Sequence, residues 1–340
     1  MRALLLILLL AALPFAGVYA DTIDIYSGEA AVEDNGQAER SRALPLALKH
    51  VLLKMSGLRT FEEYPEVEPA LGIAASILLS FHYRNVEGMA ADGSLQDELR
   101  LVARFSADRT NELARSLQLP SWPAQRIPTD IWVVVDNGLD RRVMPLEFEY
   151  AWRAMADTAA TRGFPLRWPM ADEEGQFGVD AQLLWGGYTE DLGIGPGGAA
   201  MIVAARREGP NWNVRSNLAY NGQSWTWRTQ DIDLVFALTE SMQEAADRVS
   251  AASSIAAADL EASLHELTVT GILNSSDYIR CLGYLQNLEV VSRVSVNRAQ
   301  PGKVAFRLEL NALPQYLNEA LLKGQVLGYD EAQDSYFLLQ

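Results

Sequence analysis

Two periodic patterns of apolar residues run along the chain, one with the spacing of a helix and one with the alternation of a strand. The clearest helical pattern covers 146–162, where Trp152 and Met155 share one face and Gly163 ends the run. The clearest alternation covers 304–310. Because both patterns recur in short segments throughout, the sequence predicts an α/β to α+β fold built from several small mixed modules.

The predicted elements gather into three modules. An N-terminal α/β module covers 21–119, a middle α/β module with an antiparallel meander covers 129–258, and a C-terminal module covers 260–340. The segment 120–128 contains three prolines. Proline excludes regular structure and stiffens a connection, so this segment is predicted to be a linker between the first two modules.

The pattern also predicts individual elements within the first two modules. In the N-terminal module we expect strands over 22–26, 80–86 and 95–105. We also expect one long helix over 38–55, which Gly57 ends. In the middle module we expect strands over 131–135, 181–185, 200–206, 212–220 and 224–229. A long helix over 231–250 closes that module.

The C-terminal module has the order β-α-β-β-α-β, which predicts a ferredoxin-like sandwich: a four-stranded antiparallel sheet with two helices on one face. Its first helix is predicted to be capped by Ser275 or Ser276. Two segments compete for the last strand, 325–329 and 335–339. A fold of this kind does not assign a function.

The first twenty residues have the organisation of a secretory signal peptide. Arg2 supplies a positive charge, an apolar run covers 3–13, and the small residues Val18 and Ala20 precede a predicted cleavage after Ala20. The apolar run is too short for a membrane anchor, which needs about 20 residues. The sequence therefore predicts an exported protein, periplasmic in a bacterium, with no transmembrane segment in the mature chain.

Charge and cysteine content narrow the classes of partner. The formal net charge is −16, which argues against nucleic acid or anionic lipid as the main partner, because both need concentrated Lys and Arg. Cys281 is the only cysteine, so no intramolecular disulfide can form. It lies in a predicted amphipathic helix, where burial as a small apolar residue is expected.

No motif for catalysis, a metal or a cofactor stands out. The three histidines have no recognised ligand spacing, and no nucleophile elbow is present. The segment 193–198 satisfies G-x-G-x-x-G, but a predicted strand follows it, so we interpret it as a turn. Paired carboxylates at 62–63, 172–174 and 190–191 fall in polar loops. An enzyme of unrecognised type remains an alternative.

Tryptophan is the one residue type with a candidate binding role. Eight are present, and Trp185, Trp212, Trp225 and Trp227 fall in one predicted sheet region. Trp225 and Trp227 share a face of their strand. If that face were open, with Trp212 beside it, the rings could stack on sugar rings or hold a partner peptide. The alternative is that they fill the core beneath the helix at 231–250.

Several segments resemble an uncharacterised family of exported gammaproteobacterial proteins. They are Ile25-Tyr26-Ser27-Gly28-Glu29, Val51-Leu52-Leu53-Lys54-Met55-Ser56-Gly57, the hairpin region 209–227 and the helix that begins at Asp231. The resemblance implies an exported protein of unknown function and no site residues. We therefore expect a non-enzymatic periplasmic protein that binds another envelope protein or a cell-wall component. The alternative is a carbohydrate or peptidoglycan binder.

The signal peptide gives a direct prediction. Protein isolated from the periplasm should begin at Asp21, because export removes residues 1–20. Intact-mass measurement of the purified mature chain checks this. Recovery of the folded protein from the cytosol with Met1 still attached would contradict it.

Overall fold

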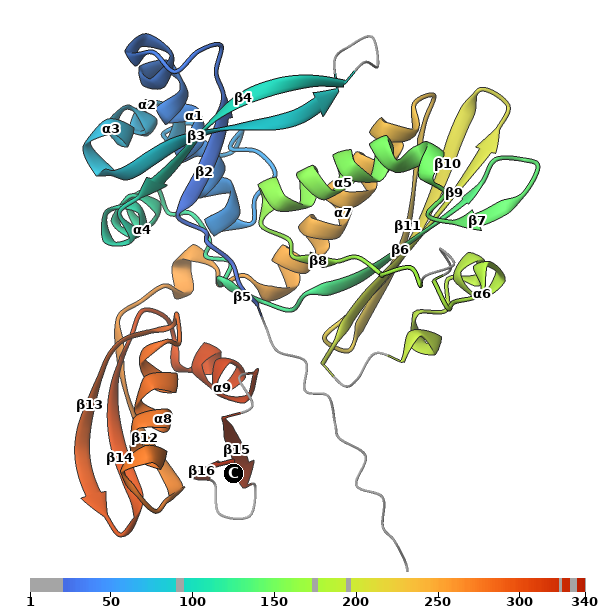
Figure 1. Cartoon of the computed structure of the whole chain (residues 1–340). Coiled ribbons are helices and arrows are strands. Elements are labelled where there is room, and N and C mark those ends of the chain that lie inside the picture. The colour runs from blue at the N-terminus through green and yellow to red at the C-terminus, as the bar shows by residue number, and fades with distance from the viewer. Residues whose placement is uncertain are drawn as a thin grey trace, which may run out of the picture.

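The computed structural model describes residues 21–89, 95–172, 177–193, 197–323, 326–330 and 335–339. The predicted signal peptide lies outside these residues. The described chain forms three mixed modules (Figure 1), which confirms the predicted fold class of small α/β to α+β modules. None of the helices in these ranges is long and apolar enough to cross a membrane.

The N-terminal module packs helix α1 against a three-stranded antiparallel sheet with the order β2-β4-β3. Its elements are β1 (Asp21–Thr22), β2 (Ser27–Ala31), α1 (Gln37–Ser56), α2 (Val67–Ala70), the 3-10 turn η1 (Leu71–Ile73), α3 (Ala74–Ile77), β3 (Leu78–Met89), β4 (Leu95–Phe105) and α4 (Ala107–Ser116). Gly57 ends α1 with φ of 71°, as predicted. The predicted strand over 22–26 is wrong, because the Asp24 carboxylate accepts hydrogen bonds from the Tyr26 N–H and the Ser27 hydroxyl and turns the chain.

The middle module is built on a six-stranded mixed sheet with the order β11-β10-β9-β6-β7, and β8 also pairs with β6. Its elements are β6 (Thr129–Asp136), β7 (Arg141–Val143), η2 (Leu146–Phe148), α5 (Glu149–Arg162), β8 (Leu166–Arg167), α6 (Ala181–Gly186), η3 (Thr189–Leu192), β9 (Ala199–Glu208), β10 (Asn211–Tyr220), β11 (Gln223–Asp231) and α7 (Leu234–Ser253), followed by η4 (Ala257–Asp259). Helices α5 and α7 lie side by side on one face, which we call the inner face, and α6 lies on the other, outer face (Figure 1).

The strand predicted over 181–185 is wrong, because this segment forms α6. The Asp180 carboxylate accepts a hydrogen bond from the Gln182 N–H and caps the helix, and Gly187 ends it in the left-handed region. Leu184 is buried against the outer face of the sheet. A short apolar run that begins after an Asp cap is a helix signal, and it outweighs the β propensity of the segment.

The C-terminal module has the predicted order of elements with one difference at its end. Its elements are β12 (Ser263–Ile272), α8 (Ser275–Gln286), β13 (Val291–Gln300), β14 (Gly302–Leu310), α9 (Pro314–Lys323), β15 (Leu327–Asp330) and β16 (Ser335–Leu338). Both candidates for the last strand form, as an antiparallel pair. Because this pair reverses the chain, β16 meets β12 in parallel, and the sheet is five-stranded and mixed instead of four-stranded and antiparallel.

Two further details of the C-terminal module bear on the sequence predictions. The cap of α8 is Asn274, whose side chain accepts a hydrogen bond from the Asp277 N–H, and not Ser275 or Ser276. Asn fits the extended backbone at this position as well as Ser does. Cys281 is fully buried in the core on α8, as expected.

The segment 120–128 is an ordered part of the junction between modules, and the prediction that it lacks regular structure is wrong. Strand β5 (Gln125–Arg126) pairs with β1. Ser121 and Ile255 exchange two backbone hydrogen bonds, of 2.9 and 2.7 Å, which tie this segment to the connection after α7. Trp122 is almost fully buried. The prolines stiffen the connection, but backbone pairing fixes its position.

The Arg126 guanidinium is the centre of the junction. It is fully buried and donates to the carbonyls of Lys54 near the end of α1, of Arg162 and Gly163 at the end of α5, and of Trp122 and Pro123 in the linker, at 2.6 to 3.3 Å. Its Cζ also lies 3.5 Å from the centre of the Trp122 ring. Burial lowers the pKa of Arg126 to about 9, so the side chain keeps its charge at neutral pH.

Arg126→Ala should lower the free energy of unfolding by at least about 3 kcal/mol, because each buried carbonyl left without a donor costs about 1–3 kcal/mol. Arg126→Lys should recover only part of this loss, because an ammonium cannot reproduce the planar fork. Urea unfolding followed by circular dichroism measures both. Arg109→Ala, at an exposed position, is the matched control with a change within about 0.5 kcal/mol. An equally small change for Arg126→Ala would contradict the role of this side chain.

Candidate functional site

The candidate binding tryptophans lie mainly in the core. Trp212 and Trp227 are only 7% and 8% exposed and belong to the cluster beneath α5 and α7. Trp225 is partly buried against the same cluster. The Arg248 guanidinium on α7 lies 4.6 Å from the Trp227 ring. The interpretation that these rings fill the core beneath the long helix is therefore confirmed for Trp212 and Trp227. A role in binding sugars stays a prediction, and this burial gives it no support.

Trp185 does not share a surface with the other three tryptophans. It lies on α6, packed on the outer face of the middle sheet, whereas Trp212 and Trp227 point to the inner face. Trp185 was grouped with the other three tryptophans because 181–185 was predicted to be a strand of the same sheet.

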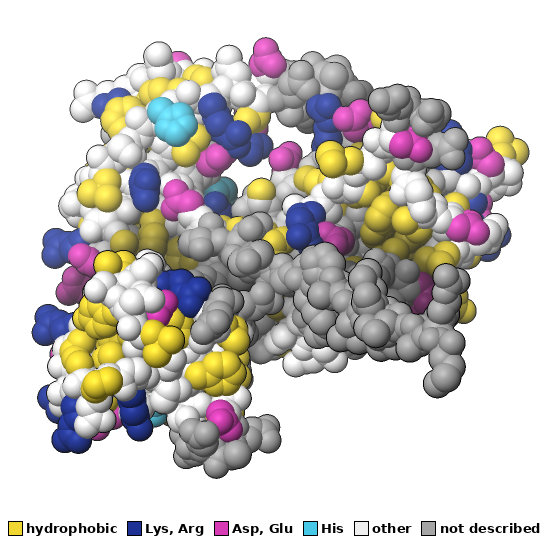
Figure 2. Space-filling model, turned by 60° about the horizontal axis from the view of Figure 1, so that its bottom comes forward, with side chains coloured by type: hydrophobic (Ala, Val, Ile, Leu, Met, Phe, Trp, Pro, Cys, Tyr) yellow, Lys and Arg dark blue, Asp and Glu magenta, His cyan; other side chains and the backbone are white. Residues whose placement is uncertain are grey.

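A polar cleft of about 410 Å³ separates the N-terminal module from α5 of the middle module. In the view of Figure 2 an opening lies between these two modules, with basic and acidic side chains gathered on its margins. Its lining combines residues of α1, β2 and the β3–β4 pair on one side with residues of α5 on the other. We take this cleft as the candidate functional site, because it brings together titratable groups from two modules.

The α1 wall of the cleft carries His50 and Lys54, one helical turn apart. His50 Nδ1 lies 2.6 Å from the Glu29 carbonyl oxygen, so it donates, and Nε2 of the neutral ring is the acceptor. Burial lowers the pKa of His50, which keeps the ring neutral at pH 7. Lys54 Nζ donates to the Ser27 carbonyl at 3.0 Å, and burial lowers the pKa of its ammonium too.

The sheet wall carries two arginines that face each other across the strands. Arg84 on β3 is the register partner of Arg100 on β4. Glu29 on β2 neutralises this pair: its carboxylate lies 2.7 Å from Arg84 and 4.0 Å from Arg100. Glu98 adds a contact of 2.8 Å to Arg100. The two like charges are therefore held together by two carboxylates on the same wall.

The opposite wall comes from α5 and carries Asp157, Ala160 and Thr161. Asp157 is exposed, and no ion pair or hydrogen bond links it to other residues of the described chain. The cleft thus has a cationic group, Lys54, on one side and a free carboxylate on the other. Such an arrangement suits a segment that carries both signs of charge.

Among the described residues, the cleft lining offers charged and polar groups that can bind a ligand. In the described ranges no cluster of His, Cys, Asp and Glu is placed to hold a metal ion. The carboxylate pairs at 62–63 and 190–191 are exposed. Residues 173–174 and 194–196, parts of two other segments singled out above, lie outside the described residues.

Sequence reasoning missed these cleft residues, although one signal was present. His50 and Lys54 are four residues apart on a strongly predicted helix, so they had to share a face. Arg84, Arg100 and Glu29 carried no signal, because the strand register alone brings them together. Asp157 lies in another module, and its place opposite Lys54 depends on the Arg126 junction.

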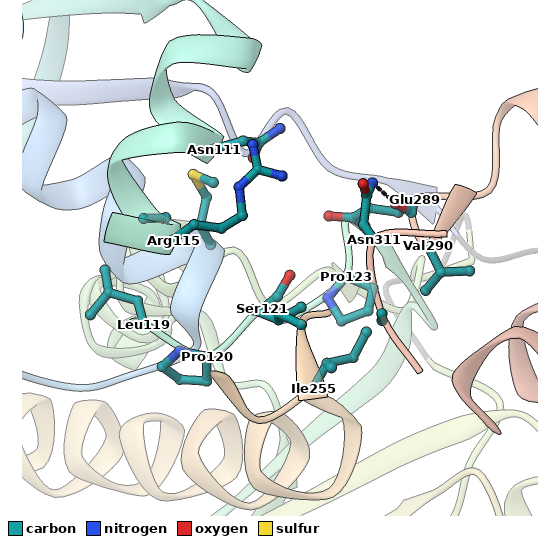
Figure 3. A pocket seen from close by; sticks show the side chains of 14 residues that line it. Asn111, Arg115, Leu119, Pro120, Ser121, Pro123, Ile255, Glu289, Val290 and Asn311 are labelled. Carbon is teal, nitrogen blue, oxygen red and sulfur yellow. Dashed lines mark hydrogen bonds between the residues drawn. The ribbon is translucent and has the colours of Figure 1, made fainter. Parts of the chain in front are cut away.

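A second, smaller cavity of about 90 Å³ lies where all three modules meet. Figure 3 shows Asn111 and Arg115 of α4 facing it from one side and Glu289 and Asn311 of the C-terminal module from the other. Between them lie the two connections, with Ser121, Pro123 and Ile255 among the lining residues. The Asn311 side chain donates to the Glu289 backbone carbonyl at 3.4 Å. The small volume of this cavity and its position indicate a structural contact between the three modules.

Glu289 is the carboxylate that lines this cavity. Its mostly buried carboxylate accepts a hydrogen bond from the Ala124 N–H of the linker, and Arg126 and the phenol of Tyr26 lie near it. Burial raises the pKa of Glu289, and the Ala124 N–H and Arg126 oppose this only in part. The protonated acid is thus favoured in the folded state relative to the unfolded chain.

Because the pKa of Glu289 is raised on folding, its contribution to stability is fully present below the unfolded pKa of about 4.3 and is lost as the pH rises through the folded value. Glu289→Gln keeps an acceptor for Ala124 but cannot ionise. The variant should therefore gain stability relative to the natural chain as the pH rises from about 4 to about 7. Urea unfolding across that range measures the difference, with the exposed Glu112→Gln as control. A stability difference between the two proteins that does not change with pH would contradict a raised pKa for Glu289.

Comparisons with known proteins reach only part of the chain. Residues 20–123 match a family described as a domain of unknown function (DUF8605), which covers the N-terminal module and part of the linker. No curated protein matches the chain. A solved structure described as an uncharacterized protein aligns with 36% of this chain and 88% of its own length, at 10% sequence identity and a TM-score of 0.14, too low to support an argument. The family match is consistent with the expected uncharacterised family.

Proposed function

We propose that this chain is a non-enzymatic binding protein of the bacterial periplasm, and that its cleft holds a charged segment of another envelope component. The observation that carries this proposal is the pair of opposed walls from two modules. Lys54 uses one of three donors within the described chain, and Asp157 faces it with a free carboxylate. Groups with unused hydrogen-bonding capacity in a cleft are available to a partner.

The junction supports the same proposal, because it fixes the two walls before a partner arrives. Arg126 ties α1, which carries His50 and Lys54, to the end of α5, which carries Asp157. A second tie links the same modules: the buried Arg162 on α5 donates to the Gly57 carbonyl at 2.8 Å. A preorganised cleft loses less conformational freedom on binding, and this favours recognition.

Site-specific photo-crosslinking in intact cells tests the cleft. A photoreactive residue at Ala160 on the α5 wall should give an adduct of discrete mass, and the double variant Lys54→Gln, Asp157→Asn should reduce its yield at least about tenfold, because each charge contributes to recognition. Mass spectrometry of the adduct identifies the partner.

The control places the same photoreactive residue at Leu139, which is 95% exposed and not part of the cleft lining. The double variant should leave the yield at that site unchanged. The proposal fails if Ala160 gives no more product than Leu139, or if the double variant leaves the Ala160 adduct intact.

A further inference from the structure

The outer face of the middle sheet carries an arginine pair that resembles the one in the cleft but lacks its carboxylates. Arg215 on β10 and Arg228 on β11 are direct register partners. Like charges placed opposite each other on antiparallel strands are unfavourable. In the N-terminal sheet Glu29 and Glu98 offset the same arrangement. For Arg215 and Arg228 no carboxylate partner is found among the residues that the structure describes.

Arg228 of this pair is exposed, whereas Arg215 is half-buried at the border of α6. Helix α6 packs on β6, β7 and β9, which leaves the outer face of β11 exposed. Arg215 donates to the Trp185 carbonyl at the border of α6, while its buried Nε has no partner in the described chain. The nearest acids along the register, Asp136 and Glu208, contact Arg206 instead. This patch is locally basic on a chain whose net charge is −16.

Strand β11 is also an edge strand that lacks most of the usual protection against pairing. It is the outermost strand in the order β11-β10-β9-β6-β7. Its nine residues pair with β10 in an unbroken register without a bulge, and they include no proline and no lysine. Backbone groups on its free side have no backbone partner in the described chain. A long, regular edge of this kind is a template for an added strand.

We propose that β11 accepts an extended acidic segment of a partner protein, which adds a strand to the middle sheet and places its carboxylates beside Arg228 and Arg215. Backbone hydrogen bonds would supply the affinity, and the two arginines would select acidic side chains. This surface lies on the middle sheet and is separate from the cleft, so the inference goes beyond the proposed function.

A second copy of this chain fits the edge less well. The outer face of β11 presents Ser224, Thr226, Arg228 and Gln230, so it offers no carboxylate to an incoming arginine. Two copies would bring a second Arg228 to the same patch and would also oppose their net negative charges. Charge complementarity therefore selects an acidic partner.

The test uses a labelled peptide of about ten residues that alternates glutamate with threonine, long enough to pair along a strand. Fluorescence anisotropy should show saturable binding to the full mature chain that weakens with added salt. Arg228→Glu should weaken binding at least about tenfold, because it replaces attraction by repulsion. Arg228→Lys should retain most of the binding.

Two control peptides separate the two parts of the inference. A peptide with lysine in place of glutamate should not bind. A glutamate peptide with methyl groups on alternate backbone nitrogens should bind at least about tenfold more weakly, because it cannot complete the ladder. This control leaves the protein unchanged, so it remains valid even if Arg228→Glu fails to fold.

The matched control variant is Arg298→Glu on β13, the exposed edge strand of the C-terminal sheet. It should leave peptide binding unchanged, as should the cleft variant Lys54→Gln, Asp157→Asn. Absence of binding by the glutamate peptide, equal binding of the lysine or N-methyl peptide, or loss of binding only in Arg298→Glu would each overturn the proposal. Because the cleft is tested separately at Ala160, failure at β11 leaves that proposal standing.

Discussion

A buried guanidinium lies at the centre of the contact between the N-terminal and middle modules. Arg126 donates to five backbone carbonyls, three of them at the ends of α1 and α5. The C-terminal end of a helix carries unpaired carbonyls and partial negative charge, so two such ends form a natural site for a cation. Glu289 acts on this charge only through space. The junction thus places a cation in the interior mainly with backbone acceptors.

The cleft depends on this constraint. Its α1 wall and its α5 wall belong to different modules. The residues of one wall are more than a hundred positions from those of the other in the sequence. Gly57 makes the close contact possible, because a Cβ there would lie 2.5 Å from Ser250 of α7. The left-handed cap of α1 is therefore also a contact point between modules. The same feature that ends the helix lets the middle module approach it.

Local signals in the sequence determined most of the elements but little of the site. Gly57 and Gly163 marked helix ends correctly because a left-handed residue is a local requirement. The helix at Ala181–Gly186 was missed because a short apolar run fits either a strand or a helix, and only Asp180 distinguished them. Arg126 could not be recognised from sequence, since its acceptors are backbone carbonyls that any residue provides. The same holds for Arg84 and Arg228, whose neighbours follow from strand register.

Because side chains alternate along a strand, the inner face of the middle sheet packs into the core and the outer face of β11 is exposed. On β11, Trp225 and Trp227 point to the inner face, where Trp227 anchors the strand beneath α7, while Thr226 and Arg228 point outward. The buried Trp227 ring therefore helps to hold this edge strand against the core. An edge strand that is packed on one face and carries Arg228 on the other has its backbone groups already extended for pairing. The tryptophans would then contribute to binding indirectly, by holding β11 in place for the acidic segment of the partner.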